Sequence, residues 1–241
     1  MKTRPGELPN TQPVEKPHKS KKGEVWIHSI WQTIQGEGPY QGYPAIFIRV
    51  AGCNLMCPGC DTDYTSHRTI YNPQQLVTRV QGYKTPGRLV VITGGEPFRQ
   101  NITPLVRLLL NTRFPVQIET NGTYYPGDDW PWTKACIVCS PKTPKIHPKI
   151  IVDCYKYVLD AEHVDPDDGL PSSALGMPGK PARPAINNVR MNSSGHIPVL
   201  LQPMDEQNEE KNTANLTAVM QSCMKFNYRI QLQIHKLLGL P

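Results

Sequence analysis

Seven short apolar runs recur along this chain of 241 residues, and they restrict the folds that it can adopt. Most are rich in β-branched residues and nearly continuous, which is typical of strands in a parallel sheet buried on both faces. Only three segments carry the apolar spacing of a helix, with Asn72 or Asn101 as an N-cap. The runs lie at 45–50, 88–93, 115–120, 135–139, 155–159, 198–202 and 228–234, and the helical segments at 73–81, 102–113 and 208–226.

More strands than helices predict a parallel, barrel-like α/β sheet in which several crossover helices are reduced to loops. We expect a single domain over 25–241. Residues 161–197 are rich in Pro, Gly and Asn and are read as an insertion, mobile or functional as a lid.

The first 24 residues hold six of the 26 basic residues against three of the 20 acidic ones, which is half of the net charge of +6. They lack apolar periodicity, so we expect a flexible basic extension rather than a nucleic-acid arm, and no direct nucleic-acid binding. No apolar run is long enough for a membrane span, and no secretory h-region is present. Seven cysteines without framework spacing favour a reducing compartment, so a cytoplasmic location is expected.

Three cysteines, Cys53, Cys57 and Cys60, lie within eight residues at Cys-x3-Cys-x2-Cys spacing. A [4Fe-4S] cluster usually takes four thiolates, so three predict a cluster with one open iron that binds a non-protein ligand. A structural zinc ion is the competing interpretation, but it needs a fourth ligand at knuckle spacing, which the sequence lacks.

The remaining cysteines are interpreted as small buried hydrophobes. Cys136 and Cys139 are three residues apart in a predicted strand and therefore face opposite sides, which does not suit a shared metal. An auxiliary cluster formed with Cys154 and Cys223 is the alternative.

The cysteine triplet follows an apolar strand, and a later strand ends in Thr-Gly-Gly-Glu-Pro at 93–97. Together these motifs resemble the radical S-adenosylmethionine superfamily. Segment 32–62 further resembles the start of the 7-carboxy-7-deazaguanine synthase family. The matching motifs continue in order at 119–123, 140–142, 202–206 and 231–241, so the resemblance spans about 25–241, without 1–24 and much of 161–197.

The resemblance implies a partial (β/α)6 TIM-like barrel of the radical SAM type with reduced helix content. It implies a lyase that converts 6-carboxy-5,6,7,8-tetrahydropterin to 7-carboxy-7-deazaguanine with loss of ammonia, in queuosine biosynthesis and tRNA modification. The implied cofactors are one [4Fe-4S] cluster, S-adenosylmethionine and Mg²⁺. A homodimer and an electron donor such as a flavodoxin are the implied partners.

Site residues are carried over by the same resemblance. The threonine hydroxyl of Thr62 is implied to hold Mg²⁺, and the carboxylate of Pro241 to reach the substrate. Glu96 either accepts a bond from the methionine ammonium or braces its loop. The residues implied for S-adenosylmethionine are Gly59, Cys60, Asp61, Gly94, Gly95, Glu96, Glu119, Asn121, Ser140, Pro141, Lys142, Gln202, Pro203, Met204 and Asp205. Those implied for the substrate are Ile34, Gln35, Gly36, Glu37, Arg49, Thr93 and Pro241.

Two other functions remain open at this level. An activating enzyme that makes a radical on a partner protein also carries the cysteine triplet. A regulatory or binding protein on the same fold would use the basic extension or the insertion to meet its partner.

Overall fold

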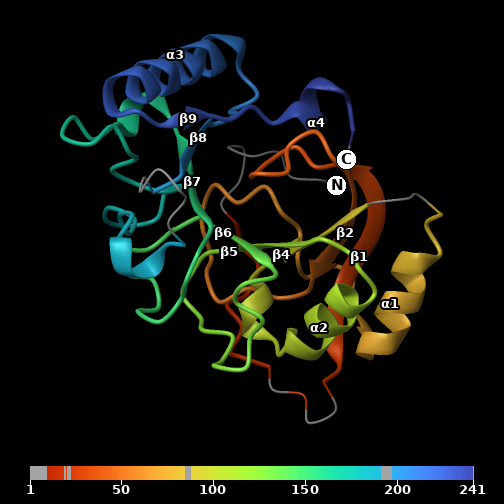
Figure 1. Ribbon diagram of the computed structural model, residues 1–241. Helices are drawn as coiled ribbons and strands as arrows, with labels where there is room; N and C mark the ends of the chain where they lie inside the picture. Colours follow the sequence, from red (N-terminus) through yellow and green to blue (C-terminus); the bar gives the residue numbers. More distant parts are fainter. Residues whose placement is uncertain (1–9, 19, 21–22, 85–87, 191–196, 241) are drawn as a thin grey trace.

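The computed structural model describes residues 10–18, 20, 23–84, 88–190 and 197–240 (Figure 1). These residues form one nine-stranded sheet with the strand order β3-β1-β2-β4-β5-β6-β7-β8-β9. The strands are β1 (Val25–Ile34), β2 (Pro44–Val50), β3 (Thr69–Tyr71), β4 (Leu89–Gly94), β5 (Val116–Thr120), β6 (Cys136–Cys139), β7 (Cys154–Leu159), β8 (Val199–Pro203) and β9 (Arg229–Ile230).

The seven predicted strands are present and pair in parallel from β2 to β9. Two strands were not predicted: β1, which pairs antiparallel with β2, and β3, which pairs antiparallel with β1. The last predicted run is also shorter than expected, because the chain leaves the sheet after Ile230 and forms the short helix α4 (Ile234–Leu237). The sheet is open within the described residues, with β3 and β9 at its edges.

The three predicted helices are confirmed as α1 (Pro73–Gln81), α2 (Thr103–Asn111) and α3 (Glu209–Phe226). Asn72 caps α1, since its side chain accepts from the Gln75 amide and the Gln75 side chain accepts from the Asn72 amide. Asn101 is not the N-cap of α2. That position belongs to Ile102, and Asn101 accepts only a longer bond from the Thr103 amide at 3.3 Å.

Helices and insertion bury one face of the sheet in a single large core. α1 and α2 pack together beside β1 and β4, while α3 lies at the other end over β8 (Figure 1). The opposite face carries only two small apolar clusters. The crossovers β5–β6, β6–β7 and β7–β8 contain no α-helix among their described residues, as the sequence predicts. The buried apolar side chains of α1, α2 and α3 all belong to the large core, so these three helices cover that face and not the opposite one.

The described part of the insertion makes side-chain bonds within itself and with the sheet. Arg183 holds it together by donating to the carboxylates of Asp165 and Asp168, at 3.0 Å and 2.7 Å. Tyr157 of β7 donates to the Ala182 carbonyl at 2.6 Å and ties the insertion to the sheet.

Residues 10–18 also differ from the expected flexible extension. Val14 forms a parallel bridge with Cys53, and His18 forms another with Gln100. Polar side chains give this segment fixed partners in spite of its lack of apolar periodicity.

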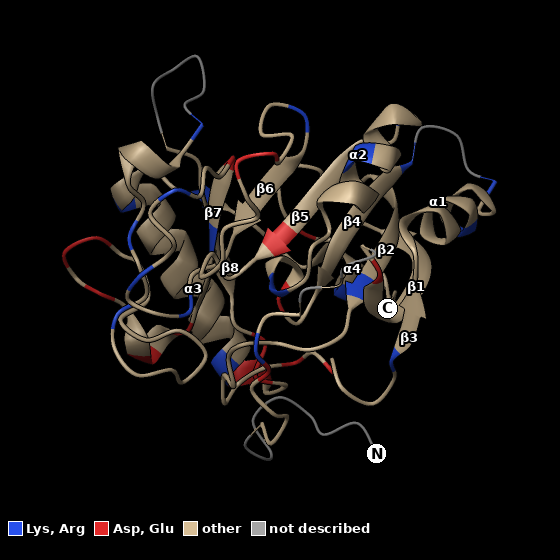
Figure 2. Cartoon of the chain, turned by 90° about the horizontal axis from the view of Figure 1, so that it is seen from below, with Lys and Arg blue, Asp and Glu red and all other residues tan. Residues whose placement is uncertain are grey.

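None of the described helices is long and apolar enough to span a bilayer. Lys and Arg are interspersed with Asp and Glu over several elements (Figure 2).

Candidate active site

Strand alternation brings polar side chains together on the uncovered face of the sheet. Arg49 and Thr93 are partners in the β2–β4 register, and Glu119 follows on β5. Residues two apart along a strand share a face, and on this face the apolar Phe47 and Val91 precede Arg49 and Thr93. The carboxyl ends of a parallel α/β sheet are where sites form in barrel folds.

These strand ends and the cysteine loop surround a cavity of about 280 Å³. Most of the predicted site residues line it, and four that lie close by do not: Gly36, Glu96, Pro141 and Pro203. Pro241 lies outside the described residues. The predicted residues that line the cavity are Ile34, Gln35, Glu37, Arg49, Cys53, Cys57, Gly59, Cys60, Asp61, Thr62, Thr93, Gly94, Gly95, Glu119, Asn121, Ser140, Lys142, Gln202, Met204 and Asp205.

All three thiols of the cysteine loop line this cavity. Burial raises the pKa of Cys53 to about 12 and of Cys60 to about 11, and it also raises the pKa of Cys57. Within the described part of the chain, no three His, Cys, Asp or Glu side chains converge on a single metal ion. Three thiolates on one loop are the protein ligands that a [4Fe-4S] cluster with one open iron would need.

The Gly-Gly turn after β4 passes very close to the chain that precedes the cysteines. Gly94 has a φ of +126°, which favours glycine. A Cβ at Gly94 would overlap the Val50 carbonyl, and one at Gly95 would overlap the Gly52 carbonyl. The two glycines therefore let the turn and the cysteine loop lie against each other.

Glu96 lies behind the cavity wall and is fully buried. Its carboxylate accepts from the Phe98 amide at 2.9 Å, the Thr120 hydroxyl at 2.7 Å and the Asn121 amide at 2.8 Å. Burial raises its pKa to about 7 in spite of these bonds. Of the two roles considered from the sequence, this geometry fits the brace.

Glu119 contacts residues that the sequence assigns to the substrate. Its carboxylate accepts from Gln35 Nε2 and from the Thr93 hydroxyl, both at 3.0 Å. Gln117 Nε2 donates to it as well, at 3.0 Å. Asn121 instead donates to Asn54 Oδ1 at 3.0 Å, close to the cysteine loop. Glu119 and Asn121, which the resemblance assigns together to S-adenosylmethionine, therefore bond to different parts of the site.

A buried ion pair lies at the opposite wall. Lys156 of β7 donates to Glu37, and Gln233 Nε2 donates to the other oxygen of the same carboxylate at 2.7 Å. Burial alone would raise the pKa of Glu37, but the charge and hydrogen bond of Lys156 outweigh this effect and lower the pKa to about 2. The cavity thus holds a fixed, ionised carboxylate.

Arg49 presents its guanidinium to the cavity with its carbon 4.9 Å from the centre of the Trp31 ring. Its Nε has no hydrogen-bond partner, and no described carboxylate lies within ion-pair distance. Burial lowers its pKa, while Asp61 and Asp63 oppose that effect. A guanidinium in this setting is ready to bind an anionic ligand.

Three polar groups lie near the cysteines. Lys142 is half-buried and donates to the Ser140 carbonyl at 3.1 Å, and desolvation of its ammonium lowers its pKa. The Thr62 hydroxyl donates to Asp61 at 3.2 Å. Asp205 pairs with Lys236 of α4 at 2.8 Å.

Several cavity residues were missed from the sequence. Lys156 carries a signal that was available, because a lysine inside an apolar strand needs a buried partner. Gln233, His235 and Lys236 lie in the C-terminal motif at 231–241, but the resemblance implied no role for them. Leu175 of the insertion carries no sequence signal.

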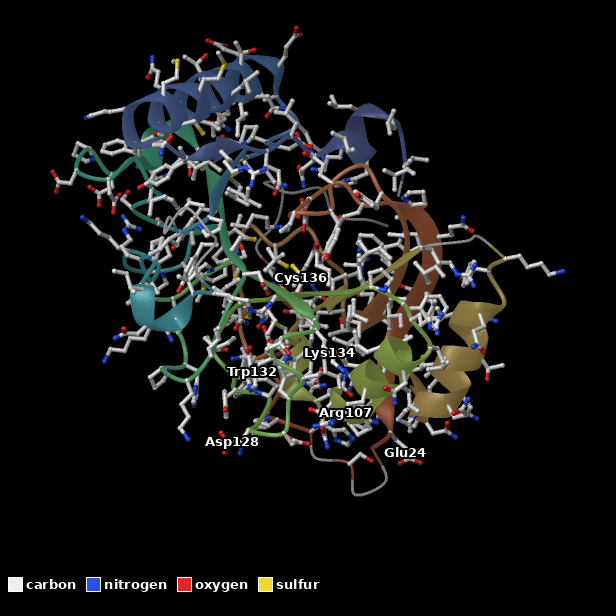
Figure 3. The ribbon with its side chains drawn as sticks, viewed as in Figure 1. Glu24, Arg107, Asp128, Trp132, Lys134 and Cys136 are labelled. Atoms are coloured by element: carbon white, nitrogen blue, oxygen red, sulfur yellow. The ribbon has the colours of Figure 1, made fainter. Side chains whose placement is uncertain are left out.

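The other cysteines lie in the packing that the sequence predicts. Cys139 belongs to the large core, whereas Cys136 and Cys154 pack in a small cluster on the other face of the sheet. In Figure 3, Cys136 lies where the loop that carries Asp128, Trp132 and Lys134 enters β6. The prediction that Cys136 and Cys139 face opposite sides is confirmed.

A parallel sheet whose carboxyl ends surround three clustered thiols and a Gly-Gly turn defines a radical S-adenosylmethionine enzyme. The chain is 39% identical over 226 residues to the 7-carboxy-7-deazaguanine synthase of Rhodospirillum rubrum, a match that covers 89% of this chain and 92% of the relative. The chain belongs to the 7-carboxy-7-deazaguanine synthase family.

Two further comparisons agree with this membership. The 7-carboxy-7-deazaguanine synthase of Rickettsia prowazekii is 36% identical over 221 residues, covering 89% of this chain and 88% of the relative. The fold is similar to the crystal structure of QueE from Escherichia coli, with a TM-score of 0.63 and 23% identity over 87% of this chain and 93% of that chain. No protein-family model matches the chain.

Proposed function

We propose that this cavity converts 6-carboxy-5,6,7,8-tetrahydropterin to 7-carboxy-7-deazaguanine with loss of ammonia, in queuosine biosynthesis. The observation that carries the proposal is the meeting of three thiols and a set of opposed charged groups in one cavity of a chain that belongs to this family. When bound through the three thiolates, a [4Fe-4S] cluster supplies the electron that cleaves S-adenosylmethionine to a carbon radical. The chain's own residues bind the substrate and S-adenosylmethionine, orient them and exclude water.

The cysteine side of the cavity would bind S-adenosylmethionine. Gly94 and Gly95 bring backbone close to the cysteine loop, where the methionine part belongs. Asn121, Ser140 and Gln202 offer hydrogen bonds at neighbouring strand ends. Lys142, which burial leaves with a lowered pKa, is a donor next to Ser140 rather than an exposed charge.

The opposite side would bind the pterin. Arg49 faces the cavity without a carboxylate partner, which suits the substrate's carboxylate. Glu37 and Glu119 are acceptors for the guanidine-like edge of the pterin. Thr93 and Gln35 orient Glu119, and Lys156 orients Glu37.

Thr62 would hold Mg²⁺ with its hydroxyl. A hard cation prefers oxygen ligands and retains most of its waters, so one protein oxygen together with substrate oxygens makes a reasonable site. The Asp61 carboxylate accepts from the same hydroxyl and adds negative charge there. Mg²⁺ would then fix the substrate carboxylate during the rearrangement.

The remaining partners are an electron donor such as a flavodoxin and a second copy of the chain. β9 is an edge of the sheet, and Ile230 in β9 and Leu232 after it are exposed. Leu237 at the end of α4 and Leu238, its C-cap, are exposed as well. These apolar groups support a homodimer.

Anaerobic reconstitution with iron and sulfide tests the proposal. The protein should hold four irons and, with a strong reductant, S-adenosylmethionine, Mg²⁺ and the tetrahydropterin, form a deazapurine. Cys57→Ala should abolish product formation, while Cys223→Ala, outside the cavity, should not. Reconstituted protein that holds the cluster but yields no deazapurine would disprove the assignment.

A further inference from the structure

The N-terminal strap, residues 10–18, runs along the loop that carries the three cysteines. Its backbone forms a parallel bridge to Cys53, and the Glu15 amide donates to the Cys53 carbonyl at 2.7 Å. Asn10 Nδ2 donates to the Cys57 carbonyl at 3.1 Å. The strap therefore contacts the main chain at two of the three cysteines.

Gln12 clamps the chain just after the third cysteine. Its Nε2 donates to the Thr62 carbonyl at 2.9 Å, and its Oε1 accepts from the Tyr64 amide at 2.8 Å. The hydroxyl of Thr65 also donates to Oε1, at 3.1 Å. One side chain thus satisfies three groups of a segment that lies outside every described helix and strand.

Glu15 completes the strap by neutralising a buried charge beneath the loop. Arg99 is only 3% exposed and donates to the Ala51 carbonyl at 2.9 Å and the Lys16 carbonyl at 2.8 Å. Among the described residues, Glu15 is its one carboxylate partner, at 3.4 Å. Loss of Glu15 would leave the buried Arg99 guanidinium without a carboxylate partner where it bonds to Ala51, two residues before Cys53.

We propose that the N-terminal strap holds the cysteine loop in its cluster-binding conformation, with Gln12 and Glu15 as positioning residues. The inference rests on the proposed function for the cluster itself, but the strap lies outside the segments that resemble the family. A strap that merely added general stability would affect every part of the fold alike. The bonds that Gln12 makes outside the strap go to Thr62, Tyr64 and Thr65, directly after the third cysteine.

Hydrogen exchange of the metal-free protein tests the clamp directly. In Gln12→Ala the Tyr64 amide loses its acceptor, so its exchange should be roughly tenfold faster while the amides of β5 are unchanged. Val14→Ala is the matched control, because the Val14 side chain is 60% exposed and its neighbours keep their contacts. Equal exchange of Tyr64 in Gln12→Ala and Val14→Ala would overturn the proposal.

Cluster retention provides a second measurement. Reconstituted Gln12→Ala and Glu15→Gln should release iron to a chelator roughly tenfold faster than the unmodified chain, and Val14→Ala should not. Unaltered release in both variants would also overturn the proposal. If the unmodified chain fails to hold iron, the proposed function is wrong, and the Tyr64 exchange still decides the role of the strap.

Discussion

Lys156 and Glu37 line the cavity, and each stabilises the charge of the other. Each would be unfavourable alone, but together they form a fixed ion pair in the cavity that Arg49 also lines. Opposed charges at fixed positions are suited to a ligand that carries both a carboxylate and hydrogen-bond donors.

Lys156→Met removes the partner of Glu37 and should destabilise the protein by about 3–5 kcal/mol at pH 7. The Glu37 pKa of about 2 lies below its unfolded value near 4.5, so in the unmodified chain its stabilising contribution is lost as pH falls from about 4.5 to 2. In the variant, burial raises that pKa, so protonation favours the folded state.

The stability difference between the two proteins should therefore shrink as pH falls, first between the raised Glu37 pKa of the variant and 4.5, and then between 4.5 and about 2. Urea unfolding at several pH values measures it. Lys156→Met with Glu37→Gln is the control, because it leaves no buried charge and should recover much of the stability. A difference that is constant with pH would contradict this account.

Arg49→Lys should raise the KM for the pterin at least tenfold with little effect on unfolding, since lysine keeps the charge but loses the planar, bidentate donors. Steady-state kinetics under anaerobic conditions measure it. An unchanged KM would show that Arg49 does not bind the substrate carboxylate.

At the scale of elements, the insertion reaches the cavity. The Leu175 carbonyl accepts from the Gly59 amide at 3.0 Å, so the conformation of the insertion affects the cysteine loop. Arg183 holds the insertion through two carboxylates, whereas Lys180 is mostly exposed and pairs with Asp165 alone.

Arg183→Met should make the insertion open locally and be cut much faster by protease, because several charge-assisted bonds are lost at once. Lys180→Met, which removes an exposed pair, should have little effect. Limited proteolysis followed by mass spectrometry locates the cuts. Equal cleavage of the two variants would contradict the role of Arg183.

How well the sequence predicts an element depends on whether its signal is local in the chain. Parallel strands such as β4 are continuous apolar runs and were found. β1 was missed because a bulge between Ile27 and Ser29 shifts the alternation of buried positions partway along the strand. The cysteine loop was found from spacing. The Lys156–Glu37 pair and the strap were not, because their partners are 119 and up to 83 residues away in sequence.

At the scale of the molecule, the two edges of the sheet differ in their surroundings. Exposed backbone at a sheet edge pairs readily with another chain. The β9 edge is followed or packed by segments with exposed apolar side chains, among them Met224 of α3 and Leu238 just after α4. The β3 edge has Ile70, which is 57% exposed. The homodimer proposed above should therefore form through the β9 edge.

Ile230→Glu combined with Leu238→Glu should convert the dimer to a monomer, because two charges would be buried without partners in an apolar interface. Ile230 is 46% and Leu238 60% exposed in the single chain, so the folded monomer should tolerate both changes. Sedimentation velocity measures the mass, and Ile70→Glu at the opposite edge is the control. Dissociation by Ile70→Glu alone would move the interface to β3, and a monomeric unmodified chain would exclude the dimer.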